Sequence, residues 1–253
     1  MDRGIVKGQT FSSEFQRFDQ DLVFIKRDHF WPRSNRQIDV FGKFWWLFLR
    51  GEKAQDVKVF ANKQWVRRPN EYALLCPPFS MVQWQLDPGP LQWEAYISPT
   101  PLPLKWNQGA VLIPWRTKSI FARTSDLIAE LDAVHHQEPL LPLENVSAIG
   151  LRTKKYIDSH FTEDLSIQTV ANNLGFHFKV MSRHFYADFG LSPSLYRNKL
   201  RIMNAKCQML FQDISVLDAA VSSGFSTPGG FNKAFHKIMG LAPSHIPNLK
   251  KQN

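Results

Sequence analysis

The sequence contains very little cysteine. Of its 253 residues only Cys76 and Cys207 are cysteines, one in each half of the chain. No Cys-x-x-Cys pair occurs, so the sequence predicts neither a zinc site nor a disulfide framework. Two isolated thiols are typical of buried cysteines in a reducing compartment, and we therefore expect a cytoplasmic protein.

Signals for membrane insertion or secretion are also missing. The longest strongly apolar run, Phe44–Leu49, lies between Lys43 and Arg50 and is far too short to span a bilayer. Residues 1–8 lack the apolar core of a signal peptide. We therefore expect no membrane association.

Catalytic motifs are absent as well. Residues 21–116 contain a single histidine, His29, whereas a metal-dependent barrel enzyme needs a cluster of histidine and carboxylate ligands. His135 and His136 cannot chelate one ion together, because adjacent helical residues point apart. The chain also has no Gly-rich phosphate loop and no Gly-x-Ser-x-Gly motif. We expect no metal, no cofactor and no enzymatic activity, which disfavours a barrel enzyme.

Positive charge is in excess and unevenly distributed. The net charge is +9, and residues 145–253 hold 13 Lys and Arg against 6 Asp and Glu. Residues 1–144 hold 18 against 16. The excess in the C-terminal part indicates a polyanionic partner, with binding that weakens as salt rises.

The N-terminal part has the pattern of a β-rich domain. Apolar-rich runs separated by turn formers predict a sandwich or barrel. These runs are Asp21–Lys26, Ile38–Leu49, Val57–Ala61, Tyr72–Cys76, Met81–Leu86, Leu91–Ile97 and Ala110–Pro114. Residues 1–20 are polar with scattered phenylalanines, and we expect them to form an arm or a poorly fixed segment.

All eight tryptophans lie between positions 31 and 115. They either line an aromatic pocket for a small molecule or simply fill the core. The candidate pocket residues are Trp31, Trp45, Trp84 and Trp93.

Residues 124–137 predict a helix, because Leu127, Leu131 and Val134 recur at helical spacing. This helix forms either a dimer contact or a cover on the β-rich domain. Residues 138–144 contain two prolines and predict a linker of limited flexibility.

Residues 166–189 predict two short helices joined at Gly175, the arrangement of a helix-turn-helix. Apolar residues of the second helix share one side, with a basic and hydroxylic stripe opposite. The apolar side is Phe178, Met181, Phe185 and Phe189, and the stripe is Lys179, Ser182, Arg183 and Tyr186. A three-helix fragment with a solvated charged face would give a similar pattern.

A second copy of this unit favours the DNA-binding interpretation. Ser166, Ala171, Gly175 and Phe176 recur as Ser215, Ala220, Gly224 and Phe225. The motif Gly-Leu-x-Pro-Ser ends both units, at residues 190–194 and 240–244. Repetition at a fixed period implies a duplicated structural unit, and two such units on one body could enter successive major grooves, ~34 Å apart.

Residues from about 146 to 250, some two-fifths of the chain, resemble the DNA-binding domain of AraC/XylS-type transcription regulators. The motifs that carry the resemblance are Leu165-Ser-Ile-Gln-Thr-Val-Ala171, Gly175-Phe176, Met181-Ser-Arg-His-Phe185, Gly190-Leu-Ser-Pro193, Ala219-Ala-Val-Ser-Ser-Gly-Phe225, Phe231-Asn-Lys-Ala-Phe235 and Gly240-Leu-Ala-Pro-Ser244. The resemblance implies two helix-turn-helix units joined by a long helix, most often in an activator. It also implies RNA polymerase as a partner and, more weakly, a cupin-like barrel that senses a small molecule.

The resemblance and the polar stripes together predict the DNA-contacting residues. In the first unit these are His177, Lys179, Ser182 and Arg183. In the second they are Thr227, Asn232, Lys233, His236 and Lys237. Gly229-Gly230 departs from the family pattern, because polar side chains usually stand there. The two glycines either reduce base reading by the second unit or permit a close approach to DNA.

We therefore predict an α+β chain of two domains: residues 1–123 form a β-rich, cupin-like barrel or sandwich, and residues 145–253 an all-α double helix-turn-helix. Residues 124–144 connect them. The predicted function is sequence-specific binding of double-stranded DNA in transcription regulation, under the control of a small molecule bound to the N-terminal domain. The predicted oligomer is a homodimer. The alternative is a constitutive or architectural DNA-binding protein whose first domain serves only dimerisation or interaction.

Overall fold

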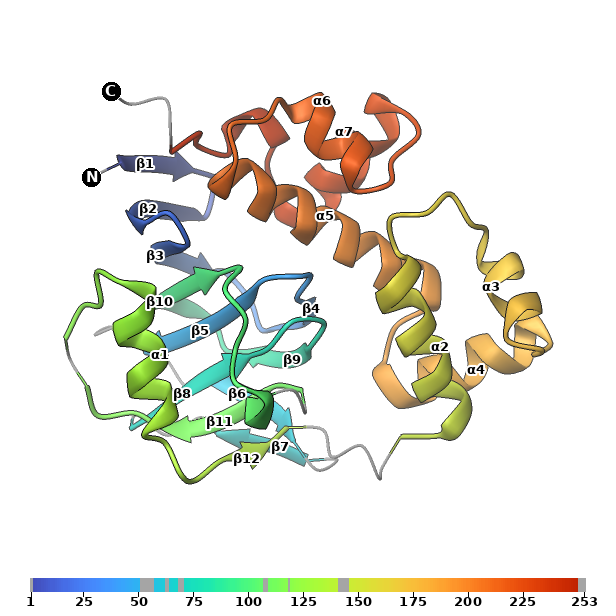
Figure 1. Ribbon diagram of the computed structural model, residues 1–253, viewed down its shortest axis with the longest axis horizontal. Helices are drawn as coiled ribbons and strands as arrows, with labels where there is room; N and C mark the ends of the chain where they lie inside the picture. The colour runs from blue at the N-terminus through green and yellow to red at the C-terminus, as the bar shows by residue number, and fades with distance from the viewer. Residues whose placement is uncertain are drawn as a thin grey trace.

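The computed structural model describes residues 2–50, 57–61, 64–67, 71–106, 109–117, 119–140 and 146–249. It consists of a β-rich N-terminal part and a helical C-terminal part, with one long helix lying across the boundary (Figure 1). The predicted α+β class, a β-rich domain followed by an all-α double helix-turn-helix, is confirmed.

Two antiparallel sheets pack face to face in the N-terminal part. The larger sheet has the order β1 (Asp2–Lys7), β2 (Phe11–Asp19), β3 (Leu22–Trp31), β10 (Gly89–Ser98), β5 (Trp45–Arg50), β8 (Tyr72–Cys76), β11 (Val111–Pro114) and β12 (Glu138–Pro139). The smaller has the order β4 (Asn35–Val40), β9 (Met81–Leu86), β6 (Val57–Ala61) and β7 (Gln64–Arg67).

The larger sheet is buried on both faces in its centre, which explains its continuous apolar runs. Successive side chains of a strand point to opposite faces. On β5, Trp46 and Phe48 therefore lie in the core between the two sheets, whereas Trp45 and Leu47 lie in a second cluster on the outer face. The helix α1 (Thr124–Asp132) and the short 3-10 helix η1 (Leu104–Trp106) cover that outer face.

The prediction that residues 1–20 form a poorly fixed arm is wrong. They form β1 and β2, paired from Asp2 with Arg17 to Lys7 with Ser12. Val6, Ser13 and Phe15 are buried, whereas the alternating residues Ile5, Lys7 and Glu14 are exposed, so the polar composition reflects a sheet with one solvated face. β1 also approaches the C-terminal segment closely, since a Cβ on Gly4 would lie 2.4 Å from Cβ of Pro247.

The helix α1 lies on its own sheet. Leu127 and Leu131, which the sequence offered for a dimer contact, are fully buried in the cluster on the outer face. A dimer through another surface stays a prediction. The predicted linker begins as a strand, because Glu138 and Pro139 of β12 pair with β11, and residues 141–144 lie outside the described part of the chain.

The C-terminal part contains the two predicted helix-turn-helix units. After α2 (Ala148–His160), the first unit is α3 (Ile167–Asn173) and α4 (Phe178–Phe189). The second is α6 (Val216–Ser222) and α7 (Pro228–Met239), followed by the 3-10 helix η3 (Pro243–His245). The helix α5 (Pro193–Phe211) joins the two units.

The backbone of the turn is the same in both units. Gly175 and Gly224 have φ of 72° and 87°, in the left-handed region that favours glycine. The next residue closes each turn, since the Phe176 N–H donates to the Ala171 carbonyl at 2.9 Å and the Phe225 N–H donates to the Ala220 carbonyl at 3.0 Å. The repeat seen in the sequence is therefore a repeat of structure.

The N-terminal part packs against each unit separately. The core between the sheets continues into α5 and the second unit, where Phe44 of the β part stacks on Phe211 with ring centroids 5.3 Å apart. A different cluster joins the smaller sheet to the first unit. Among the described helices, none is both long and apolar enough to cross a membrane.

Candidate nucleic-acid interface and interdomain pocket

The helix α4, the second helix of the first unit, presents the predicted polar stripe to solvent. Its apolar side is anchored, because Met181, Phe185 and Phe189 are buried. Lys179 and Arg183 are exposed on the other side, and Ser182 is half-buried between them. These side chains can therefore reach a partner without any change in the fold.

The helix α7 has the same arrangement. Phe231 and Phe235 are buried, and the predicted residues Asn232, Lys233, His236 and Lys237 are exposed. At their N-termini the two helices differ. The side chain of Thr227 caps α7 by accepting the Gly230 N–H at 3.2 Å, whereas His177 precedes α4 without a side-chain cap.

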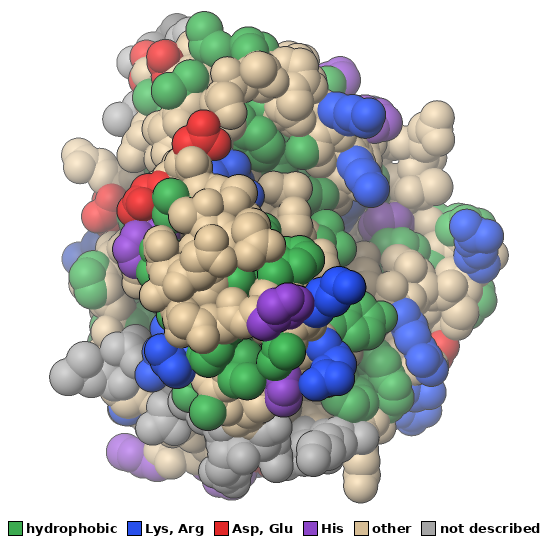
Figure 2. Space-filling model, turned by 90° about the vertical axis from the view of Figure 1, so that its right-hand side faces the viewer, with side chains coloured by type: hydrophobic (Ala, Val, Ile, Leu, Met, Phe, Trp, Pro, Cys, Tyr) green, Lys and Arg blue, Asp and Glu red, His purple; other side chains and the backbone are tan. Residues whose placement is uncertain are grey.

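The face of the molecule that carries the first unit is rich in cationic side chains. Figure 2 views this face and shows lysine, arginine and histidine side chains in several groups, with acidic side chains mainly toward one upper side. Such a distribution suits binding to the phosphate backbone of a nucleic acid. Lys and Arg side chains neutralise the phosphates, and this binding weakens as the salt concentration rises.

The two glycines of α7 are not equivalent. A Cβ on Gly229 would meet no atom within 4 Å, so packing within the chain does not require glycine there. A Cβ on Gly230 would lie 2.9 Å from Oγ1 of Thr227, the atom that caps the helix. Gly230 thus protects the cap, while Gly229 leaves an open surface at the start of the helix.

Polar contacts from α5 fix the two units relative to each other. Arg201 donates hydrogen bonds to the carbonyls of Phe161 and Glu163 beside the first unit. Three residues further along α5, the Asn204 amide donates to Ser223 of the second unit at 3.1 Å.

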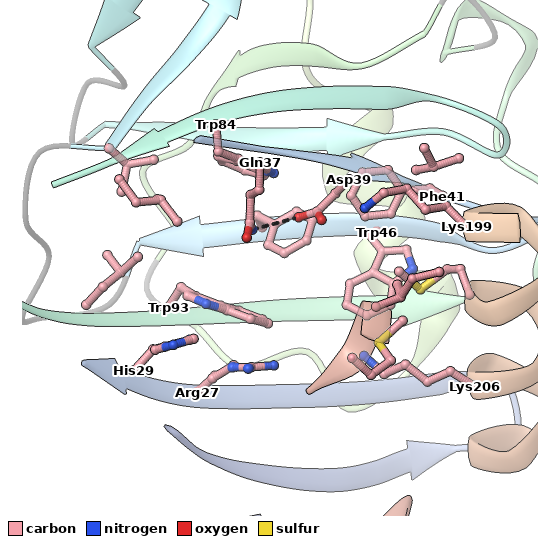
Figure 3. Close-up of a pocket in the computed structure, with 18 of the residues that line it drawn as sticks. Arg27, His29, Gln37, Asp39, Phe41, Trp46, Trp84, Trp93, Lys199 and Lys206 are labelled. Atoms are coloured by element: carbon pink, nitrogen blue, oxygen red, sulfur yellow. Dashed lines mark hydrogen bonds between the residues drawn. The ribbon is translucent and has the colours of Figure 1, made fainter. Parts of the chain in front are cut away.

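A pocket of about 190 Å³ lies between the β part and the helices α5 and α7. Figure 3 shows its polar and charged residues, with Arg27 and His29 on β3, Gln37 and Asp39 on β4, and Lys199 and Lys206 on α5. Its aromatic wall consists of Trp31, Phe41, Trp46, Phe48, Trp84 and Trp93. The helix α7 contributes Ile238 and Met239.

Positive charge predominates in this pocket. Its described lining contains three cations, Arg27, Lys199 and Lys206, against the single carboxylate of Asp39. Burial lowers the pKa of Lys206 to about 8 and that of Arg27 to about 10. Burial also raises the pKa of Asp39, against the opposing effect of the nearby cations.

The cations contact aromatic rings. Lys206 Nζ lies 4.8 Å from the centroid of the Trp46 ring, and the Arg27 guanidinium lies 3.8 Å from that of Phe11. The Arg27 Nε–H and the indole N–H of Trp31 are buried without a hydrogen-bond partner among the described residues. Buried donors of this kind are costly unless they are paired, so the site favours an anionic or hydrogen-bond-accepting occupant.

The structure brings together three of the four predicted pocket tryptophans, Trp31, Trp84 and Trp93. The prediction for Trp45 is wrong. Its neighbour Trp46 lines the pocket, and adjacent strand residues point to opposite faces. Trp45 lies instead on the outer face of the larger sheet, where its Nε1–H donates to the Thr100 carbonyl at 2.7 Å.

The four charged residues that surround the pocket, Arg27, Asp39, Lys199 and Lys206, were not predicted from the sequence. The only available signal was a charged residue within a buried element. Asp39 stands in the apolar run Ile38–Leu49, and Lys206 stands on a helix that is apolar on several sides.

Comparison with known proteins identifies the helical part. Residues 170–248 match the family model described as a helix-turn-helix domain. The HTH-type transcriptional activator RhaS of Enterobacter sp. (strain 638) is 30% identical over 104 residues, which are 41% of this chain and 37% of RhaS. An uncharacterized HTH-type transcriptional regulator of Staphylococcus aureus is 31% identical over 88 residues, 35% of this chain and 12% of that protein.

One solved structure extends the similarity in fold to both parts. The crystal structure of unsaturated fatty acid bound ToxT from Vibrio cholerae covers 89% of this chain and 94% of ToxT, with a TM-score of 0.51 and 12% identity. The chain spans less than two-fifths of the curated relatives it matches. The sequence matches identify the helical part as a helix-turn-helix domain of the AraC/XylS type, and the similarity to ToxT shows a shared two-domain fold.

The buried Lys206 gives stability a pH dependence that can be measured. Its pKa is about 8 in the folded protein and 10.5 in the unfolded chain, so between these values the unfolded state binds more protons. Stability therefore rises with pH above 8, and below 8 the cost of burying the charge is fully present. We expect the free energy of unfolding, measured by urea titration, to increase from pH 8 to 9.

The matched variant Lys206→Met should lose this increase. Measurement stops at pH 9 because the Cys207 thiol, whose pKa is about 12 when buried and 9.0 in the unfolded chain, contributes a change of opposite sign that begins near pH 8 and grows above pH 9. An equal increase from pH 8 to 9 in Lys206→Met would contradict the assignment.

Proposed function

We propose that the chain binds duplex DNA sequence-specifically through α4 and α7, and that an organic anion in the interdomain pocket controls this binding. The observation that carries the first part is the pair of helix-turn-helix units with identical turns, each presenting an exposed polar stripe. The relatives named as activators support a role in transcription activation.

In the first unit, Arg183 and Lys179 are proposed to read bases. Arginine and lysine suit the O6 and N7 acceptors of guanine in the major groove. In the second unit, Asn232 suits the N6 and N7 atoms of adenine, with Lys233 beside it. His236 and Lys237, one turn further along α7, are proposed to contact phosphates.

The open surface at Gly229 is proposed to permit close approach of the DNA backbone. Glycine in a helix costs about 1 kcal/mol relative to alanine, and neither packing nor a left-handed backbone requires it at this position. A missing side chain at the start of α7 brings the backbone N–H groups nearer to a phosphate.

For the effector, the support is the composition of the pocket. Three cations and a largely aromatic wall suit a molecule with an anionic group and an apolar body. ToxT, which shares the fold, is described with a bound unsaturated fatty acid, a ligand of this general chemistry. Because both parts of the chain line the pocket, a bound molecule would contact the β-rich domain and the DNA-binding domain at the same time.

Recognition of DNA is tested with Arg183→Ala and Lys237→Ala. Loss of a bidentate base contact should relax discrimination at one base pair by ~1–3 kcal/mol. Loss of a phosphate contact should weaken binding to all duplexes alike and reduce the salt slope by about 1. Competition binding with an operator and a scrambled duplex, at several salt concentrations, separates the two effects, and the reverse pattern would overturn these assignments.

Effector binding is tested by tryptophan fluorescence of the full-length protein, since the reader helices contain no tryptophan. Oleate, benzoate and inorganic phosphate serve as probes of increasing polarity. We expect a saturable change with an organic anion, and Lys206→Met should weaken it roughly 10- to 100-fold through the lost charge-assisted contact.

The matched control is Lys26→Met, because Lys26 lies on β3 outside the pocket and pairs with Glu94 on the surface. Equal loss of response in both variants would place the binding elsewhere. A protein that binds its operator but responds to none of the probes would favour constitutive DNA binding.

A further inference from the structure

The strand β4 is a wall between the pocket and the first helix-turn-helix unit. Its side chains alternate, as strand geometry requires. Gln37 and Asp39 line the pocket, whereas Ile38 between them packs in the cluster that includes the core of the first unit. Val40, at the end of the strand, belongs to that cluster and also borders the pocket. Each pocket-facing residue is thus one peptide bond from a residue that contacts the reader.

Strand β9 completes the wall in the same register. Gln37 pairs with Trp84, which lines the pocket, and Ile38 pairs with Gln83. Directly opposed residues of antiparallel strands share a face. Two paired strands, β4 and β9, therefore form both the face that lines the pocket and the opposite face that packs on the first helix-turn-helix unit.

On the reader side, Ile38 rests on the end of the recognition helix. Gly190 ends α4 in the left-handed conformation, with φ of 73°, and its N–H donates to the Tyr186 carbonyl at 2.8 Å. A Cβ on Gly190 would lie 3.1 Å from Cδ1 of Ile38 and 3.7 Å from Nε2 of Gln83. Both wall residues therefore pack closely on the backbone that terminates α4.

On the pocket side, the same strand carries the only carboxylate among the described lining residues. The Gln37 amide donates to Oδ2 of Asp39 at 3.3 Å, and Asp39 lies in the field of Lys199 and Arg27 (Figure 3). An anion entering the pocket would compete with Asp39 for these cations and repel it. The side chain that an occupant disturbs most is thus on β4.

The two reader units meet the pocket differently. The second unit contributes Ile238 and Met239 of α7 directly. Among the described lining residues, none comes from α2, α3 or α4. An occupant can therefore act on α7 by contact, but it reaches α4 through an intervening element.

We propose that β4 is that element: displacement of Gln37 and Asp39 by an occupant moves Ile38 against Gly190 and changes how α4 is held. Ile38 is a positioning residue for the recognition helix, and Asp39 is the residue through which the pocket acts on it. This inference rests on the proposed role of the pocket as the effector site.

The test uses the full-length protein without DNA or effector, so that it can fail independently of the proposed function. Amide hydrogen exchange is followed at residues 186–191 in the wild type, Asp39→Asn, Ile38→Val and the double variant. Asp39→Asn removes the charge on the pocket face with little change of shape. Ile38→Val removes Cδ1, the atom nearest Gly190.

We expect Asp39→Asn to change exchange at these amides roughly 2- to 30-fold, the range of couplings that single residues transmit between sites. In the Ile38→Val background the same substitution should have a much smaller effect, because the connection is already broken. The matched control is Leu91→Val on β10, which lines the pocket outside the wall and should leave residues 186–191 unchanged.

Unchanged exchange in Asp39→Asn would overturn the proposal, and so would an equal change in both backgrounds, since the route would then bypass Ile38. An equal effect of Leu91→Val would show a general loosening instead of coupling through β4, and would also overturn it. If Asp39→Asn does not fold, Gln37→Met removes the hydrogen bond on the same face and is judged by the same outcomes.

Discussion

The structure depends on α5 being buried on nearly all sides. Its residues Ile202, Leu210 and Phe211 complete the core that begins between the β-sheets, while Tyr196 and Leu200 complete the core of the first reader unit. No other described helix belongs to both clusters. Because both units pack on this one helix, a displacement of α5 would affect the β-rich part and both helix-turn-helix units.

Burial of α5 places a charged pocket in the interface, which is unfavourable when the pocket is empty. Lys206 and Lys199 on the helix face Arg27 of the β part, with only Asp39 as a counter-charge among the described lining residues. An excess of buried positive charge destabilises the arrangement unless an anion joins it. A ligand that binds the assembled state stabilises it by mass action, which couples occupancy to the orientation of the two domains.

The sequence predicts the two helix-turn-helix units well and the pocket poorly, for physical reasons. Caps and left-handed glycines such as Gly175 and Gly224 are local signals, and the repeat doubles each of them. The pocket instead depends on which face of a strand points inward, and the adjacent pair Trp45 and Trp46 leaves that choice open in the sequence. The strands at residues 2–19 were missed because a one-sided amphipathic sheet looks polar in composition.

The proposed DNA recognition requires that α5 hold the two helices α4 and α7 at a fixed spacing. The most direct measurement is selection of a random duplex pool on the full-length protein at near-physiological salt. We expect a motif with two constrained blocks about one helical turn apart. One short block would contradict base reading by both units, and salt-sensitive binding with no selected motif would contradict sequence-specific recognition altogether.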